Sequence, residues 1–155
     1  MDLSTDVADV AASESDVIDV LLAHHRQIKA ALIRVEDVPA EAHRSALRTL
    51  AELIQRHEST EADVVRPLTR RFLSDGEAIA HARFVEEDQI SELLERLSAM
   101  DPTGQRFVGA FAVFRDVYGC HMHREEAEEF GPLRDCVDRQ ELVNRGVAAQ
   151  RLSSY

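Results

Sequence analysis

Residues 53 to 68 read LIQRHESTEADVVRPL and contain the pattern that decides the fold. Apolar residues in and before this stretch recur at the spacing of one buried helix face, namely Leu47, Leu50, Ile54, Val64 and Leu68. His57 and Glu61 fall on the same face, one helical turn apart. Because a buried charge without a partner is costly, these two side chains predict a partner inside the protein.

Similar amphipathic stretches lie on both sides of this helix, and turn signals separate them. The turn signals are Pro39, Ser74-Asp75-Gly76, Asp101-Pro102-Thr103-Gly104 and Gly131-Pro132. We expect Ser13 or Ser15 to cap the first helix, and Pro67 to kink the second helix or end it early. Short connections between long helices make neighbours antiparallel, which predicts an all-α, up-down-up-down four-helix bundle.

A chain of 155 residues suits a single domain. Residues 1–13 lack helical periodicity, and we expect them to form a flexible acidic arm. The bundle is assigned to residues 14–133. Residues 134–155 follow the last turn signal and are expected to form a tail with a further short helix.

Every predicted helix carries polar residues on its inward apolar face. The third helix, for example, has an inward stripe of Ala80, Phe84, Glu87, Ile90, Leu94 and Leu97. The polar members of the four stripes are His25, His57, Glu61, Glu87, His121 and Glu125. Two helices repeat the spacing His-x-x-x-Glu, as HESTE and HMHRE. Measured along the chain from the shared turns, all six residues lie at one height to within about one helical turn.

Three histidines and three carboxylates inside an apolar bundle require positive charge for balance. Imidazole and carboxylate ligands together suit iron, manganese or zinc, and carboxylates can bridge two ions in a bundle core. The six residues therefore predict a dinuclear metal site. Ion pairing with a buried arginine is the alternative, although few arginines fall on these stripes.

Four further residues have alternative roles near this layer. His81 is the rival of Glu87 as the metal ligand from the third helix, and Glu58 adjoins His57 as an additional carboxylate. His24 borders the first stripe, and we expect it to be a partly exposed histidine, with a place beside or among the ligands as the alternative. Tyr118 lies one turn before His121, so its hydroxyl can bond a ligand or a bound oxygen species, or else the ring is ordinary core.

Runs of glutamate close to these positions favour solvated surfaces. The residues concerned are Glu86, Glu126, Glu128 and Glu129.

Composition excludes several classes of partner. The formal net charge of −11 leaves no basic stripe for a phosphate backbone, so we expect no nucleic acid partner and no anionic membrane surface. The start of the chain, MDLSTDVADVAASESD, is unlike a secretory signal, and no apolar run is long enough to span a membrane. These features favour a cytoplasmic protein, as a monomer or small homo-oligomer.

Three segments together resemble the hemerythrin-like HHE cation-binding family. LLAHHRQIKAAL is similar to the family's first helix, with His25 followed by Ile28, while HESTEADVVRPL and HMHREEAEEFGPL resemble its two His-x-x-x-Glu segments. The resemblance covers about residues 16 to 133. It implies a di-iron site, oxo- or hydroxo-bridged, with His25, His57 and His121 as ligands, Glu61 and Glu125 as bridges, and manganese or zinc as alternative metals.

The third helix departs from the family pattern. Family members usually have a histidine three residues before Ile or Val, whereas EEDQISELLERL has Glu87 before Ile90. The resemblance therefore implies that Glu87 replaces the fourth histidine ligand. A more anionic ligand set stabilises ferric iron, which works against reversible O₂ carriage.

The resemblance leads to two functional hypotheses. The first is a non-haem di-iron protein that reacts with a small oxidant in oxidative or nitrosative stress defence, with H₂O₂ preferred over O₂ or NO and catalase-like disproportionation as the activity. The second is a module that binds, stores or senses O₂ or iron without turnover. A metal-free helical interaction protein would instead keep its fold after chelation.

Overall fold

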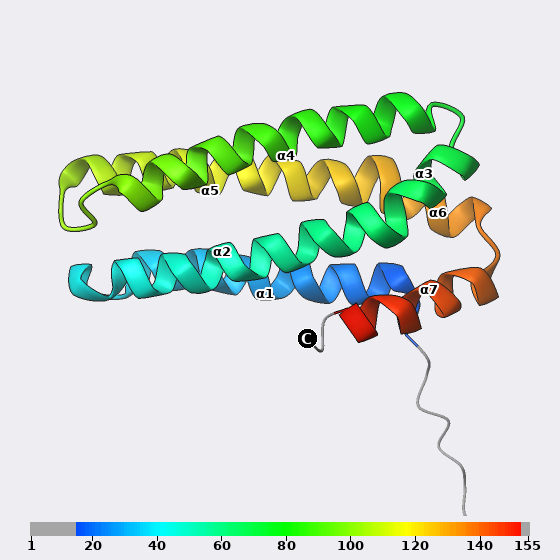
Figure 1. Ribbon diagram of the computed structural model, residues 1–155, viewed down its shortest axis with the longest axis horizontal. Coiled ribbons are helices and arrows are strands. Elements are labelled where there is room, and N and C mark those ends of the chain that lie inside the picture. The colour runs from blue at the N-terminus through cyan, green and yellow to red at the C-terminus, as the bar shows by residue number, and fades with distance from the viewer. Residues whose placement is uncertain (1–14, 153–155) are drawn as a thin grey trace, which may run out of the picture.

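The computed structural model describes residues 15–152, and in this range the chain is all-helical. Four long helices form an antiparallel bundle (Figure 1). The long helices are α1 (Val17–Asp37), α2 (His43–Thr60), α4 (Gly76–Ala99) and α5 (Gln105–Glu125). The shorter segments are η1 (Ala40–Ala42), η2 (Glu61–Val65), α3 (Arg66–Phe72), η3 (Glu126–Phe130), α6 (Gly131–Cys136) and α7 (Arg139–Leu152). Of these, α3, α6 and α7 lie at one end of the bundle, opposite the connection between α1 and α2 (Figure 1).

The start of α1 corrects one expectation about capping. The side chain of Asp16, and not of Ser15, accepts the hydrogen bond from the Asp19 backbone N–H, at 2.9 Å. Ser13, the other predicted cap, lies outside the described residues. At the other end of α1, Val38 is extended before Pro39, because proline restricts the residue that precedes it.

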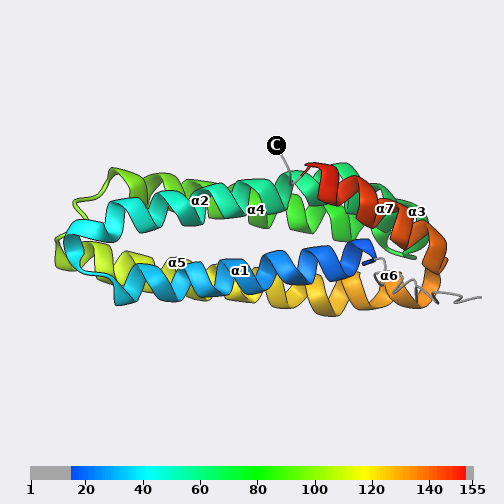
Figure 2. The ribbon, with the colours of Figure 1, turned by 90° about the horizontal axis from the view of Figure 1, so that it is seen from below.

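Two apolar clusters fill the interior, with the polar layer between them. The longer one is built on residues such as Ile28, Leu50 and Phe114, and the shorter one on Leu21, Leu68 and others. Along α1, His25 lies between Leu21 and Ile28, so the chain passes from one cluster to the other through the polar layer. Figure 2 shows that α1 and α5 run along one side of the bundle while α2 and α4 run along the other. The polar layer is therefore enclosed by apolar packing at both ends.

The inward stripe of α4 differs from the expectation at one position. Phe84 is 64% exposed, whereas its neighbour Arg83 is 2% exposed. The spacing from Ala80 to Glu87 allows either residue to face inward. Arg83 of α4 does so because its Nη2 atom donates to Oε2 of Glu128 in η3, at 3.0 Å. The prediction of an inward Phe84 was wrong.

A π-helical turn lies at the end of each His-x-x-x-Glu segment: η2 begins at Glu61, the last residue of the first segment, and η3 begins directly after Glu125, the last residue of the second. The backbone N–H of Arg66 bonds the carbonyl of Glu61, and the N–H of Gly131 bonds that of Glu126, which is the wide π pattern. Pro67 and Pro132 are the second residues of α3 and α6, in the first turn, where a helix tolerates proline. Pro67 interrupts the second helix as expected, and each wide turn changes which residues face inward.

The C-terminal segment packs back onto the start of the bundle. α7 lies against α1 (Figure 1), and Gly146 sits so close that an added Cβ would be 2.3 Å from the carbonyl oxygen of Ser15. α6 (Gly131–Cys136) runs across the expected boundary between residues 133 and 134. The predicted acidic arm, residues 1–13, lies outside the described residues. Within residues 15–152, no helix combines the length and apolarity needed to cross a membrane.

Candidate metal centre

A first cluster of potential ligands joins three helices. Nε2 of His25 (α1) lies 3.1 Å from Nε2 of His57 (α2) and 3.1 Å from Oε2 of Glu125 (α5). Nε2 of His57 is 3.5 Å from the same Glu125 oxygen. All three side chains are buried, and their donor atoms lie within 4.8 Å of one another. Two nitrogens and one oxygen therefore face a common point.

A second cluster lies beside the first and shares Glu125 with it. Its members are Glu61, Glu87, His121 and Glu125. Oε1 of Glu125 lies 2.9 Å from Nε2 of His121, while Glu61 Oε2 lies 3.5 Å from Nε2 of His57 in the first cluster. Glu125 thus presents one oxygen to each cluster, and Glu61 also touches both. This is the arrangement expected of carboxylates that bridge two ions.

A second row of carboxylates orients two of the histidines. Nδ1 of His25 lies 2.7 Å from Glu126 Oε1, and Nδ1 of His121 lies 2.8 Å from Glu86 Oε2. A carboxylate at Nδ1 holds the proton there, so that the Nε2 lone pair faces the interior. Such carboxylate–histidine pairs are typical of histidines that bind metals.

Several buried polar atoms around the two clusters have no hydrogen-bond partner within residues 15–152. These atoms are Oε1 of Glu61, Oε1 of Glu58, Nδ1 of His57 and the hydroxyl of Tyr118. Unpaired buried polar atoms are rare in folded proteins because each costs free energy. Glu61 belongs to the second cluster, so its unpaired Oε1 atom is available to a cation there. The donor set thus fits cations of the kind that imidazole and carboxylate bind.

Arg66 supplies positive charge to the second cluster. Its Nη2 atom lies 2.6 Å from Glu87 Oε1, and 3.2 Å from both Glu61 Oε2 and Glu125 Oε1. Its Nη1 atom lies 2.6 Å from Oε2 of Glu129. One buried guanidinium therefore pairs with four carboxylates.

Burial and charge shift several pKa values in this layer. Burial and the neighbouring Glu125 carboxylate raise the pKa of Glu61. Burial alone would also raise the pKa of Glu125, but hydrogen bonds from His121, His25 and His57 hold it well below its usual value. Burial lowers the pKa of His57. Although burial opposes the change, the bond to Glu125 raises the pKa of His121 to about 9. The layer thus concentrates negative charge on Glu125.

Comparison with known proteins agrees with this arrangement. The model of the hemerythrin HHE cation-binding domain matches residues 16–133, which is most of the chain. The chain belongs to the hemerythrin HHE cation-binding domain family. A crystal structure of an HHE cation-binding domain-containing protein from Mycobacterium kansasii has the same fold, with a TM-score of 0.78 and 18% sequence identity. The match covers 91% of this chain and 87% of that one. Among curated proteins, none matches the sequence significantly.

The HHE domain brings together all six residues expected as ligands. Glu87 lies in the second cluster, whereas its rival His81 is exposed on α4. Glu58 is half-buried beside the clusters, and burial together with the charge of Glu87 raises its pKa to about 8. Burial raises the pKa of Tyr118, whose ring centroid lies 5.6 Å from that of His121.

His24 is buried in this HHE domain at 9% exposure, so the expectation that it is partly exposed was wrong. Its ring lies edge-on to that of His57, with the two centroids 5.8 Å apart. Burial and the proximity of His57 lower the pKa of His24 to about 4. His24 is therefore packed beside the first cluster and is not a member of it.

Sequence reasoning missed the charged residues that surround the clusters. Glu129 was expected at the surface but is 0% exposed, and Glu126 and Glu86 bond the histidines. Arg66 was missed because it does not fall on an α-helical stripe that includes Glu61. The π turns place Arg66 and Glu129 inward, and the proline that follows each His-x-x-x-Glu segment was the available signal.

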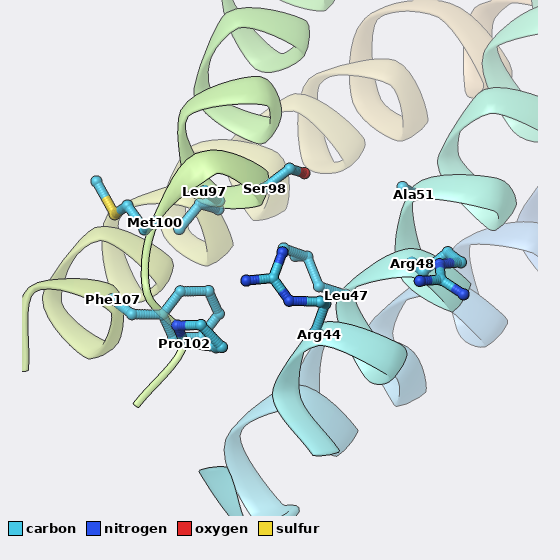
Figure 3. Close-up of a pocket in the computed structure, with 9 residues that line it drawn as sticks. All are labelled: Arg44, Leu47, Arg48, Ala51, Leu97, Ser98, Met100, Pro102 and Phe107. Atoms are coloured by element: carbon cyan, nitrogen blue, oxygen red, sulfur yellow. The ribbon is translucent and has the colours of Figure 1, made fainter. Parts of the chain in front are cut away.

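A separate cavity of about 270 Å³ lies at the far end of the HHE bundle (Figure 3). Leu47, Leu97 and Phe107 contribute apolar walls, and Arg44 extends from α2 toward Pro102. Arg44 precedes His57 on α2 by roughly 20 Å of helix, so this cavity is not continuous with the two clusters.

Proposed function

We propose that this HHE domain holds two iron ions and reacts with a small oxidant, preferentially H₂O₂. The observation that carries the proposal is that the carboxylate of Glu125 contributes one oxygen to each of two adjacent ligand clusters. His25 and His57 would hold the first ion, and His121 and Glu87 the second. Glu61 and Glu125 would contact both.

The ligand set favours iron in its oxidised state. Three carboxylates and three histidines carry more negative charge than a set in which histidine replaces Glu87. Added negative charge stabilises ferric relative to ferrous iron, which opposes reversible O₂ carriage and favours redox turnover. Catalase-like disproportionation suits such a site, because H₂O₂ serves as both oxidant and reductant and no partner protein is required.

When bound, the iron pair supplies two electrons that, with two protons, reduce one H₂O₂ to two waters, and it regains them from a second H₂O₂ that leaves as O₂ and two protons. The residues of the chain would bind and orient the peroxide. The hydroxyl of Tyr118 and Oε1 of Glu58 are buried polar atoms beside the clusters without hydrogen-bond partners in residues 15–152. Both can hydrogen-bond a small oxygen species. The surrounding phenylalanines, with Phe114 0% exposed, would exclude bulk water.

Reconstitution with iron tests the assignment. The purified chain is loaded with ferrous iron without oxygen, and iron per chain and the optical spectrum are measured before and after H₂O₂, together with O₂ release. We expect about two iron ions per chain, ferric absorption bands after oxidation, and one O₂ for every two H₂O₂ consumed. Fewer than about one iron per chain after reconstitution would rule out the di-iron assignment.

A variant separates metal binding from the reaction with peroxide. Tyr118→Phe should keep its iron but release O₂ about 100-fold more slowly, as expected when a positioned proton donor is lost. His123→Gln is the matched control, because His123 lies on the same helix and is exposed. Iron binding without O₂ release in the wild type would leave the storage or sensing role as the function.

A further inference from the structure

The Nη2 atom of Arg66 lies among the oxygens of the second cluster. It is 2.6 Å from Glu87 Oε1, 3.2 Å from Glu61 Oε2 and 3.2 Å from Glu125 Oε1. These three carboxylates are all the oxygen ligands of that cluster. The guanidinium nitrogen therefore lies where a cation bound by the same oxygens would lie.

The other half of the guanidinium is anchored outside the two clusters. Nη1 of Arg66 donates to Oε2 of Glu129 at 2.6 Å, and the hydroxyl of Thr69 donates to Oε1 of the same carboxylate. Glu129 and Thr69 are both 0% exposed. Because Glu129 belongs to neither cluster, this pairing can persist when Nη2 leaves the second cluster.

The first cluster has a different environment. In the first cluster His25 and His57 face Oε2 of Glu125, whereas Arg66 contacts only the other oxygen of that carboxylate, Oε1. Lys29 pairs with Glu126, which is not a member of the cluster. A cation can thus enter the first cluster without displacing a positively charged side chain. In the second cluster, by contrast, a cation must replace the contacts that Arg66 makes with Glu61, Glu87 and Glu125.

We propose that Arg66 acts as an internal cation that occupies the second metal position, so that the two positions fill in a fixed order and with unequal affinity. This inference rests on the proposed function, because it assumes that the two clusters bind metal ions. The first ion binds His25, His57 and Glu125. The second ion binds only when Nη2 swings away while Nη1 stays on Glu129. Arg66 is thus a positioning residue that keeps the carboxylates of the second cluster paired in the singly loaded protein.

The order of filling has a chemical consequence. A domain with one ion has a single redox-active metal beside a guanidinium. One ferrous ion that becomes ferric supplies one electron, whereas reduction of H₂O₂ to two waters requires two. The contacts of Arg66 therefore hold the singly loaded domain in an inactive form. Arginine suits this role better than lysine, because its planar fork can release one nitrogen and keep the other bonded.

Titration of the metal-free chain with ferrous iron without oxygen, followed by calorimetry, tests the inference. We expect the wild type to bind one ion tightly and a second at least about 30-fold more weakly, as expected when a buried ion pair must be displaced. In Arg66→Met the two affinities should converge to within about 5-fold. Because Arg66→Met leaves the buried carboxylate of Glu129 without its charged partner, the double variant Arg66→Met, Glu129→Gln is titrated as well. Arg70→Met is the matched control, since Arg70 lies one turn further along α3 and is 48% exposed.

Side-chain NMR of the arginine Nε–H groups gives a second readout, with a diamagnetic Zn²⁺ probe. The Nε–H resonance that disappears in Arg66→Met belongs to Arg66. Its chemical shift should stay unchanged while the first equivalent of Zn²⁺ is added and should change while the second is added. Equal affinity for two ions in the wild type would overturn the role of Arg66. The same holds if the ratio of the first to the second binding affinity is the same in the folded double variant as in the wild type. A wild type that binds neither Fe²⁺ nor Zn²⁺ would overturn the proposed function itself, and this result is distinct from the other two.

Discussion

Oε2 of Glu125 lies 3.1 Å from Nε2 of His25, although 100 residues separate the two in the chain. The second oxygen of Glu125 lies 2.9 Å from His121 Nε2, one turn earlier on the same helix. The contact with His121 lies within one helix and depends only on the four-residue spacing. The contact with His25 forms only when α1 and α5 pack with these two residues at the same height. Glu125 is the residue that the two clusters share.

Replacement of Glu125 should therefore affect both ions, whereas replacement of Glu87 should affect one. We expect Glu125→Ala to bind less than about 0.2 ions per chain and Glu87→Ala to keep about one, because metal affinity falls steeply when a ligand is lost. Metal analysis after gel filtration measures both. Glu128→Ala is the control, since Glu128 is 53% exposed and pairs with Arg83. Two retained ions in Glu125→Ala would contradict the shared role.

The second-row carboxylates should tune the two positions separately. Glu126→Ala frees Nδ1 of His25 and should weaken the first position, while Glu86→Ala frees Nδ1 of His121 and should weaken the second, each by about 10- to 100-fold. Competition with a chelator of known affinity measures each loss. Glu92→Ala, at an exposed position of α4, should change neither affinity. If Glu126→Ala and Glu86→Ala weaken the same binding event, the assignment of histidines to positions is wrong.

Removal of metal should lower thermal stability. Burial raises the pKa of Glu61, so the metal-free chain must keep a carboxyl group neutral or tolerate a buried charge. A metal held at 100 times its dissociation constant adds about 2.7 kcal/mol to the free energy of unfolding. For a chain of this size that corresponds to a rise in Tm of roughly 5–10 °C. Calorimetric melting with and without chelator measures the difference, and coincident melts would argue against a metal-loaded native state.

The packing of α7 predicts a large difference between two glycine substitutions. Gly146→Ala would place a Cβ 2.3 Å from the carbonyl oxygen of Ser15, so α7 must move away from α1. We expect a loss of about 1–3 kcal/mol in the free energy of unfolding, the usual cost of overpacking. Gly109→Ala meets nothing within 4 Å and should be neutral or stabilising, by up to about 1 kcal/mol. Urea melts compare the two, and equal stabilities would mean that α7 does not pack on the bundle in solution.

Sequence periodicity was sufficient to predict most of the fold. Apolar residues such as Leu50 and Ile54 recur at helical spacing, and Pro39, Gly76 and Pro102 mark the turns between antiparallel neighbours. The same periodicity predicted which polar residues face inward, because His57 and Glu61 repeat the register of the leucines around them. The confirmed fold class follows from local spacing, which a single sequence contains.

The third helix shows where periodicity stops being decisive. Ala80 is buried and Glu87 is 19% exposed, but the spacing between them permits either Arg83 or Phe84 to face the core. Arg83 turns inward because the carboxylate of Glu128, from a distant part of the chain, lies 3.0 Å from its Nη2 atom. No pattern within α4 contains that information.

The sequence by itself determined the four-helix bundle and the six inward polar residues, because helix period and turn chemistry are local properties of the chain. Only the tertiary structure decided how these residues are charged, oriented and paired. The π turns after Thr60 and Glu125 shift the register of the following residues, and this shift carries Arg66 and Glu129 into the interior. A buried ion pair between residues 63 positions apart depends on helix packing, so it could be found only once the helices were in place.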